Sequence, residues 1–73
     1  MTEQELKDEL NKVVERTGII RMEQHCSIFT AATRALREAD VYWVDAMYEM
    51  YDLDLDALSD YVAHEWLHRQ KEA

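Results

Sequence analysis

Apolar residues recur along this chain with a period close to 3.6 residues, which is the spacing of an amphipathic α-helix. The chain contains no proline and one glycine, so few positions interrupt the pattern. The first helix is expected to begin after Thr2, because Thr2 and Glu5 have the spacing of a capping box. It is expected to end at Gly18, a residue type common just beyond a helix. Its apolar stripe consists of Leu6, Leu10, Val13 and Val14.

The same pattern predicts up to three further helices. A second is expected over residues 20–38, and a third over Val41–Tyr51 with Asp40 as its N-cap. A fourth is expected to be capped by Asp54 or Asp56, because the Asp-Leu-Asp-Leu-Asp run of residues 52–56 places acids near a helix N-terminus. The expected inward faces hold Met22, Cys26, Phe29, Ala32 and Leu36 in the second helix, Trp43, Met47 and Met50 in the third, and Leu55, Leu58, Val62 and Trp66 in the fourth.

These elements predict an all-α protein, a single acidic domain over residues 1–73 built as a small bundle of three to four short helices. A chain of this size buries only about 60% of its unfolded surface. The sequence therefore leaves open an alternative in which a helical hairpin completes its core on a partner, or on a second copy as a homodimer. The side chains expected to form the core are Leu10, Val14, Phe29, Leu36, Trp43, Met47, Leu58, Val62 and Trp66.

The composition narrows the classes of function. A single cysteine excludes an internal disulfide and favours a reducing, cytoplasmic setting. Residues 1–10 have neither the basic nor the apolar part of a signal peptide, and no run of about 20 apolar residues is present to cross a membrane. A net charge of −8 repels phosphate and argues against direct binding of nucleic acid. No cofactor is expected.

Acidic and aromatic residues are concentrated between Glu38 and His68, a segment without lysine or arginine. It holds nine of the 16 acids and six of the seven aromatics, so acid is interleaved with the side chains that usually anchor protein interfaces. This predicts a surface that binds a basic protein partner, with a merely solvated face as the alternative. The residues predicted to bind are Tyr42, Asp45, Tyr48, Glu49, Asp52, Asp56 and Asp60.

Residues 64–68, His-Glu-Trp-Leu-His, match the HExxH pattern. In that pattern two histidines one helical turn apart bind zinc and the glutamate activates a water molecule. On a helix, however, His64 and His68 would point away from the apolar stripe and toward solvent. We therefore predict a solvated helix end and no metal site, and keep a zinc-dependent hydrolase using His64, Glu65 and His68 as an alternative. His25 and Cys26 are expected to pack on the inner face of the second helix.

Three consecutive stretches in the acidic segment follow the order of residue types found in a known protein family. They are Tyr-Trp-Val-Asp-Ala-Met at residues 42–47, Tyr-Glu-Met-Tyr at 48–51 and Asp-Leu-Asp-Leu-Asp-Ala-Leu at 52–58. Over residues 41–67 the chain resembles the late-transcription coactivators of T4-type phages. The resemblance implies a non-catalytic adaptor that contacts bacterial RNA polymerase through apolar helix surfaces. That family usually ends in an acidic–hydrophobic tail that engages the sliding clamp, and residues 69–73 do not match it, which puts clamp binding in doubt.

These observations predict a small acidic phage-type regulatory protein, not an enzyme, that acts in the host cytoplasm. It would bind and modulate a host nucleic-acid machine, with RNA polymerase as the leading candidate. The same acids allow a second hypothesis, a DNA-mimicking inhibitor of a restriction or CRISPR-type nuclease. A mimic should lose binding as its acids are neutralised and should be displaced by DNA. An adaptor should depend on a few aromatic or apolar contacts and should tolerate DNA.

Overall fold

Four α-helices make up the part of the chain that the structure, a computed structural model, describes, residues 2–72. They are α1 (Glu3–Gln24), α2 (Ile28–Glu38), α3 (Val41–Tyr51) and α4 (Leu55–Glu72). The predicted all-α fold is therefore confirmed. Within residues 2–72, no helix combines the length and the apolar character needed to cross a membrane.

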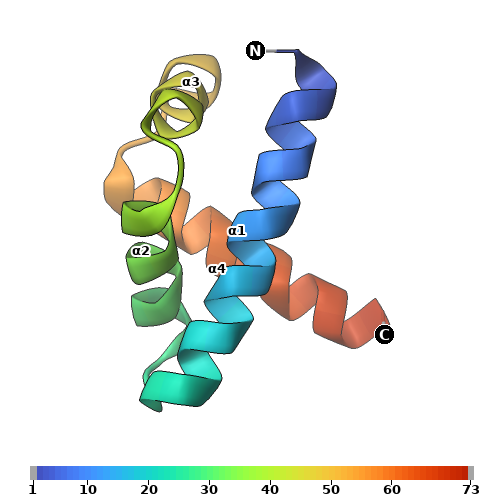
Figure 1. Ribbon diagram of the computed structural model, residues 1–73, viewed down its shortest axis with the longest axis vertical. Helices are drawn as coiled ribbons and strands as arrows, with labels where there is room; N and C mark the ends of the chain where they lie inside the picture. Colours follow the sequence, from blue (N-terminus) through green and yellow to red (C-terminus); the bar gives the residue numbers. More distant parts are fainter. Residues whose placement is uncertain (1, 73) are drawn as a thin grey trace.

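The helices pack around one core, with α3 at the end of the bundle (Figure 1). α1 and α2 run in opposite directions, and α4 packs against both of them. α3 joins the other three mainly through Trp43 and Met47, which are buried in the shared core. The Trp43 indole Nε1 also donates a hydrogen bond to the Leu6 carbonyl at 3.1 Å, which fixes α3 against the first turns of α1.

Side-chain caps set the beginning of each helix. Each cap oxygen accepts a hydrogen bond from a backbone N–H group two or three residues further on, which would otherwise lack a partner. The predicted caps at Thr2 and Asp40 are confirmed, and of the two acids considered for α4 the structure uses Asp54. The pairs are Thr2 with Glu5 (3.2 Å), Ser27 with Thr30 (3.2 Å), Asp40 with Tyr42 (2.8 Å) and Asp54 with Ala57 (2.8 Å).

The predicted boundary between the first two helices is wrong. α1 continues through Gly18 to Gln24, and the chain reverses at His25, whose backbone is left-handed with φ of 50°. Gly18 lies instead where α4 crosses α1, because a Cβ atom at this position would sit 2.6 Å from Nε1 of Trp66. The glycine therefore permits a close helix–helix approach and does not stop the helix.

Four side chains expected on inward faces are exposed, namely Met22, Phe29, Met50 and Leu55, the last of which is 37% exposed at the first residue of α4. Met22 and Phe29 were expected on one face of a single helix, but Met22 belongs to α1 and Phe29 to α2. Their side chains are 74% and 41% exposed. Met50 lies near the end of α3 and is 60% exposed. His25 is also exposed and does not pack on the second helix, while Cys26 is half-buried.

The remainder of the predicted core is confirmed. Val14, Leu36, Trp43, Met47, Leu58 and Val62 are buried, and Leu10 and Trp66 are half-buried against them. The sequence analysis did not place Ile20, Thr17 or Ser59, which are fully buried. The two hydroxyls are satisfied, because Thr17 donates to the Val13 carbonyl at 2.7 Å and Ser59 shares a hydrogen bond with the Thr33 hydroxyl at 2.9 Å.

The basic side chains are largely engaged on the α1, α2 and α4 side of the molecule. Arg16 donates to Glu38 at 2.8 Å, which ties α1 to the end of α2, and this hydrogen bond lowers the pKa of the Glu38 carboxyl. Arg21 stacks over Trp66 at 5.4 Å from the ring centroid. Arg69 reaches back from α4 to the Asn11 side chain of α1 at 2.7 Å.

Candidate protein-binding surface

Four of the predicted binding residues form one row on the outer face of α3. Tyr42, Asp45 and Glu49 follow one another at intervals of three or four residues, so they share one side of the helix. Asp52 follows three residues later as the C-cap of α3, where the backbone is left-handed with φ of 50°. All four are exposed, and Tyr42 is 76% exposed. The row points away from the core because Trp43 and Met47, on the opposite side of the same helix, are buried. We call Tyr42, Asp45, Glu49 and Asp52 the α3 row.

Tyr48 does not belong to that row. Its side chain is half-buried and packs against the core cluster, so much of its contact area is already used inside the molecule. Among the residues predicted to bind a partner, the structure therefore leaves Tyr42 as the one fully exposed aromatic.

Asp56 and Asp60 lie one turn apart near the start of α4, and both are exposed. The short connection of residues 52–54 joins α3 to α4, so Asp52 begins this corner and Asp56 lies just beyond it on α4. Asp60 has a local partner, because its carboxylate lies 3.4 Å from Nδ1 of His64. The acidic surface thus consists of the α3 row and a second, shorter group on α4.

Most of these acids have no cationic partner within the described part of the chain, residues 2–72. Across residues 2–72, the ion pairs closer than 4.0 Å include none with Asp45, Glu49, Asp52 or Asp56. An uncompensated row of carboxylates produces a negative potential that attracts a basic surface and speeds its approach. The row is thus suited to an encounter with a basic partner.

The histidines of the HExxH pattern lie on the exposed side of α4, and each has its own acidic neighbour. His64 lies beside Asp60, and Nε2 of His68 lies 3.0 Å from Glu72. Glu65 pairs with Arg69 at 3.3 Å. Over residues 2–72, no three His, Cys, Asp or Glu side chains come together in a way that could hold a metal ion. His25, the third histidine, is at the far end of α1 and is not brought to this position.

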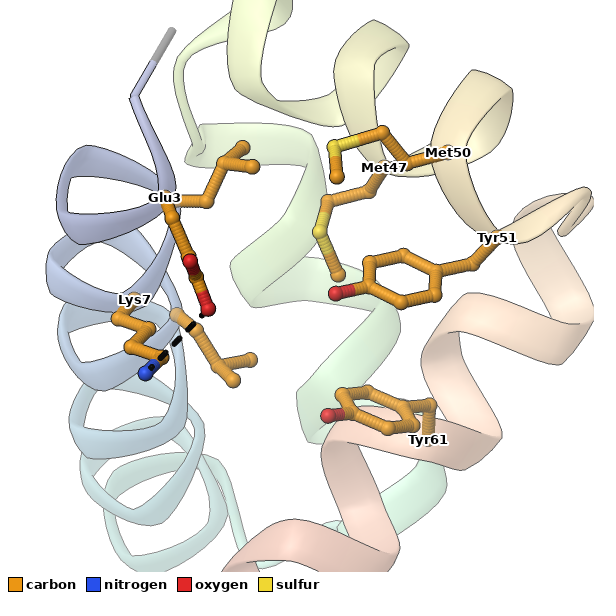
Figure 2. A pocket seen from close by; sticks show the side chains of 8 residues that line it. Glu3, Lys7, Met47, Met50, Tyr51 and Tyr61 are labelled. Carbon is orange, nitrogen blue, oxygen red and sulfur yellow. Dashed lines mark ion pairs between the residues drawn. The ribbon is translucent and has the colours of Figure 1, made fainter.

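The structure also contains a groove that the sequence analysis missed. A cavity of about 320 Å³ lies between the N-terminal half of α1, the end of α3 and the middle of α4 (Figure 2). A signal for it was present in the sequence, because Met47, Met50 and Tyr51 have helical spacing and more apolar character than one small core needs. We call it the α1–α3–α4 groove, and it is lined by Glu3, Leu6, Lys7, Leu10, Met47, Met50, Tyr51 and Tyr61.

Two tyrosines form one wall of this groove. Figure 2 shows the rings of Tyr51 and Tyr61 one above the other, with both hydroxyls directed toward α1. Partial burial raises the pKa of the Tyr61 hydroxyl, and the negative charge of Glu65 raises it further. The Tyr61 hydroxyl therefore stays protonated at ordinary pH, and the wall presents aromatic surface with a polar edge.

Comparisons with protein-family models, with curated proteins and with solved structures find no match to this chain. The resemblance to phage coactivators accordingly remains a prediction from residues 41–67.

Proposed function

We propose that this protein is a non-catalytic regulatory adaptor that binds a basic surface of a nucleic-acid machine through the α3 row. The observation that carries the proposal is a set of exposed carboxylates on the outer side of α3, beside an exposed tyrosine, with no cation among residues 2–72 paired to them. A row that served only solubility would not need an exposed aromatic residue at its start.

The row combines the two properties that a charge-steered interface requires. Carboxylates raise the rate of encounter with a basic patch, and this effect weakens as salt is added. Contact area then comes from the start of α3, where Val41 and Tyr42 are 62% and 76% exposed. Tyrosine is among the residues that most often carry binding energy at protein interfaces.

RNA polymerase is the leading candidate for the partner, and the sequence resemblance of residues 41–67 supports this choice. A DNA-mimicking inhibitor of a nuclease remains the competing proposal. The two differ in whether Tyr42 matters as much as the carboxylates, and in whether free DNA displaces the partner.

An affinity capture from bacterial lysate tests the proposal. The wild type would be compared with two variants, Tyr42→Ala and the doubly neutralised Asp45→Asn/Glu49→Gln. A matched control, Glu15→Gln/Glu23→Gln, removes the same charge from exposed positions of α1. We expect RNA polymerase with the wild type and the α1 control, and a clear loss with both α3 variants.

Two results would contradict the proposal in different ways. If all four proteins capture the same partners, the α3 row is only a solvated face. If a nuclease is captured, is released by added DNA and is retained by Tyr42→Ala, the protein is a DNA mimic and not an adaptor.

A further inference from the structure

The α1–α3–α4 groove is an apolar surface that the bundle leaves open. We propose that it receives the apolar stripe of a basic amphipathic helix. The inference deepens the proposed function, because it assigns a second contact to the same basic partner and so rests on that function.

The dimensions of the groove suit a short stretch of helix. Its α1 wall extends from Glu3 to Leu10, which is about 10 Å or two helical turns. A volume of about 320 Å³ is at the lower end of the range for small-molecule sites, so it accommodates a few side chains more readily than a large cofactor. In the helix-in-groove mode, anchors at positions i, i+3 or i+4 and i+7 of the bound helix enter such a site.

The walls consist of side chains that adapt to an incoming apolar surface. Met50, Tyr51 and Tyr61 are 60%, 57% and 45% exposed, although they adjoin one another around a single cavity. Methionine is flexible and polarisable and is common at surfaces that bind helices. Leu6 and Leu10 provide the opposite wall, one turn apart on α1. An occupant would cover the exposed parts of Met50, Tyr51 and Tyr61, whereas Leu6 and Met47 at the base of the groove are already buried.

The net charge of the molecule favours a cationic occupant. Among the described residues that line the groove the charges balance, because Glu3 and Lys7 lie 3.7 Å apart as an ion pair. The excess of eight negative charges over the whole sequence therefore provides the attraction for a basic helix. A second copy of the chain would bring another net charge of −8 to this surface, and the resulting repulsion favours a basic helix over self-association.

The groove and the α3 row lie on different sides of α3. Met47 and Met50 face the groove, while Asp45 and Glu49 face outward. One basic partner can therefore contact α3 on both sides. Substitutions in the groove and substitutions in the α3 row should therefore weaken binding independently, so the two proposed contacts can be tested separately.

Isothermal titration calorimetry with a synthetic peptide tests the groove directly. The probe is a leucine–lysine peptide of about 18 residues with leucines at helical spacing, long enough to form a helix on binding. The control is a peptide of the same composition in which the order of leucine and lysine destroys that spacing. We expect binding of the first peptide, and at least tenfold weaker binding of the second.

The protein variants identify the site of binding. Met50→Ser and Tyr51→Ser each remove exposed apolar surface without changing charge, and we expect each to weaken peptide binding by roughly tenfold. The row variant Asp45→Asn/Glu49→Gln should change peptide affinity much less at moderate salt. Because both groove positions are more than half exposed, circular dichroism should show folded proteins in every case.

Three results would overturn the inference. Equal affinity for both peptides would mean charge attraction alone, and unchanged affinity in both serine variants would place the peptide elsewhere. Sedimentation velocity tests for self-association of the protein. If the protein self-associates and Met50→Ser abolishes this, the occupant of the groove is a second copy of the chain. The lysate capture with Tyr42→Ala tests only the α3 row, and the peptide titration tests only the groove. A failure of the proposed function can therefore be told apart from a failure of the groove inference.

Discussion

At the scale of single residues, Gly18 shows how a tertiary contact can decide the role of a side chain. Glycine is the second-worst residue for a helix interior and costs about 1 kcal/mol relative to alanine. Here it lies in the interior of α1, where it lets the Trp66 indole approach the backbone. The helix tolerates this unfavourable residue because the crossing of α1 and α4 requires the space.

We predict that Gly18→Ala destabilises the protein by about 1 kcal/mol, although alanine favours the helix, because overpacking costs about 1–3 kcal/mol. In a Trp66→Leu background the clash is relieved, and the same substitution should stabilise by up to about 1 kcal/mol. Urea unfolding of the four proteins in this double-mutant cycle measures both values. Stabilisation by Gly18→Ala in the wild-type background would mean that the indole moves aside at no cost.

Local signals in the sequence predicted the caps at Thr2 and Asp40 correctly, but they missed the cap at Ser27 and failed at Gly18. A cap depends on a few adjacent residues, so Thr2 and Asp40 could be recognised from spacing alone. The role of Gly18 depends on Trp66, which lies 48 residues further along the chain. The left-handed turn at His25 carries neither glycine nor asparagine, so no strong local signal marked the true end of α1.

At the scale of elements, α3 contributes to both proposed binding surfaces and depends on few contacts for its position. Trp43 anchors it to α1 through a buried ring and a hydrogen bond to the Leu6 carbonyl. Its first turn is fixed by Asp40, whose carboxylate accepts hydrogen bonds from the N–H groups of Tyr42 and Trp43 at 2.8 and 3.3 Å. The start of the α3 row therefore depends on one cap.

Replacing this cap should loosen the start of α3 before it affects the rest of the bundle. We predict that Asp40→Ala costs about 1 kcal/mol of stability, whereas Asp40→Asn, which retains the capping oxygen and removes the charge, costs much less. Chemical denaturation measures the stability, and amide hydrogen exchange of Tyr42 and Trp43 locates the change. An equal loss in both variants would show that the charge, and not the cap, stabilises the helix.

The sequence predicted this element better than any other. The bounds of α3 and its buried pair Trp43 and Met47 agree with the structure, because a short helix between two acidic caps is defined locally. The α1–α3–α4 groove could not be predicted in the same way. It is bounded by three helices, and Met50 becomes part of its wall only because of how α3 is placed against α1.

At the scale of the whole molecule, the distribution of charge is uneven. The net charge is −8, and the segment between Glu38 and His68 contributes acids without any lysine or arginine. The longest dimension of the chain is 32 Å, comparable to the Debye length of about 30 Å at 0.01 M salt. At low salt, therefore, the acids of α3 and α4 repel one another and the other acids across the molecule.

We predict that raising NaCl from about 0.01 M to about 1 M increases the melting temperature, because screening relieves this repulsion. For a chain of this size, a gain of about 1 kcal/mol corresponds to about 4–8 °C. The variant Asp45→Asn/Glu49→Gln, with two negative charges fewer, should show a smaller increase than the wild type. A melting temperature that falls with salt would indicate that ion pairs such as Arg16–Glu38 outweigh the repulsion.

The different surroundings of the two tryptophans give the molecule a pair of intrinsic optical reporters. Trp43 has no solvent exposure, whereas Trp66 is half-buried beneath the guanidinium of Arg21. Emission from Trp43 should therefore lie at shorter wavelength and resist aqueous quenchers, and emission from Trp66 should be red-shifted and quenchable. With Trp66→Phe, the remaining signal follows the attachment of α3 alone. Detachment of that helix could then be timed separately from the opening of the α1–α4 crossing.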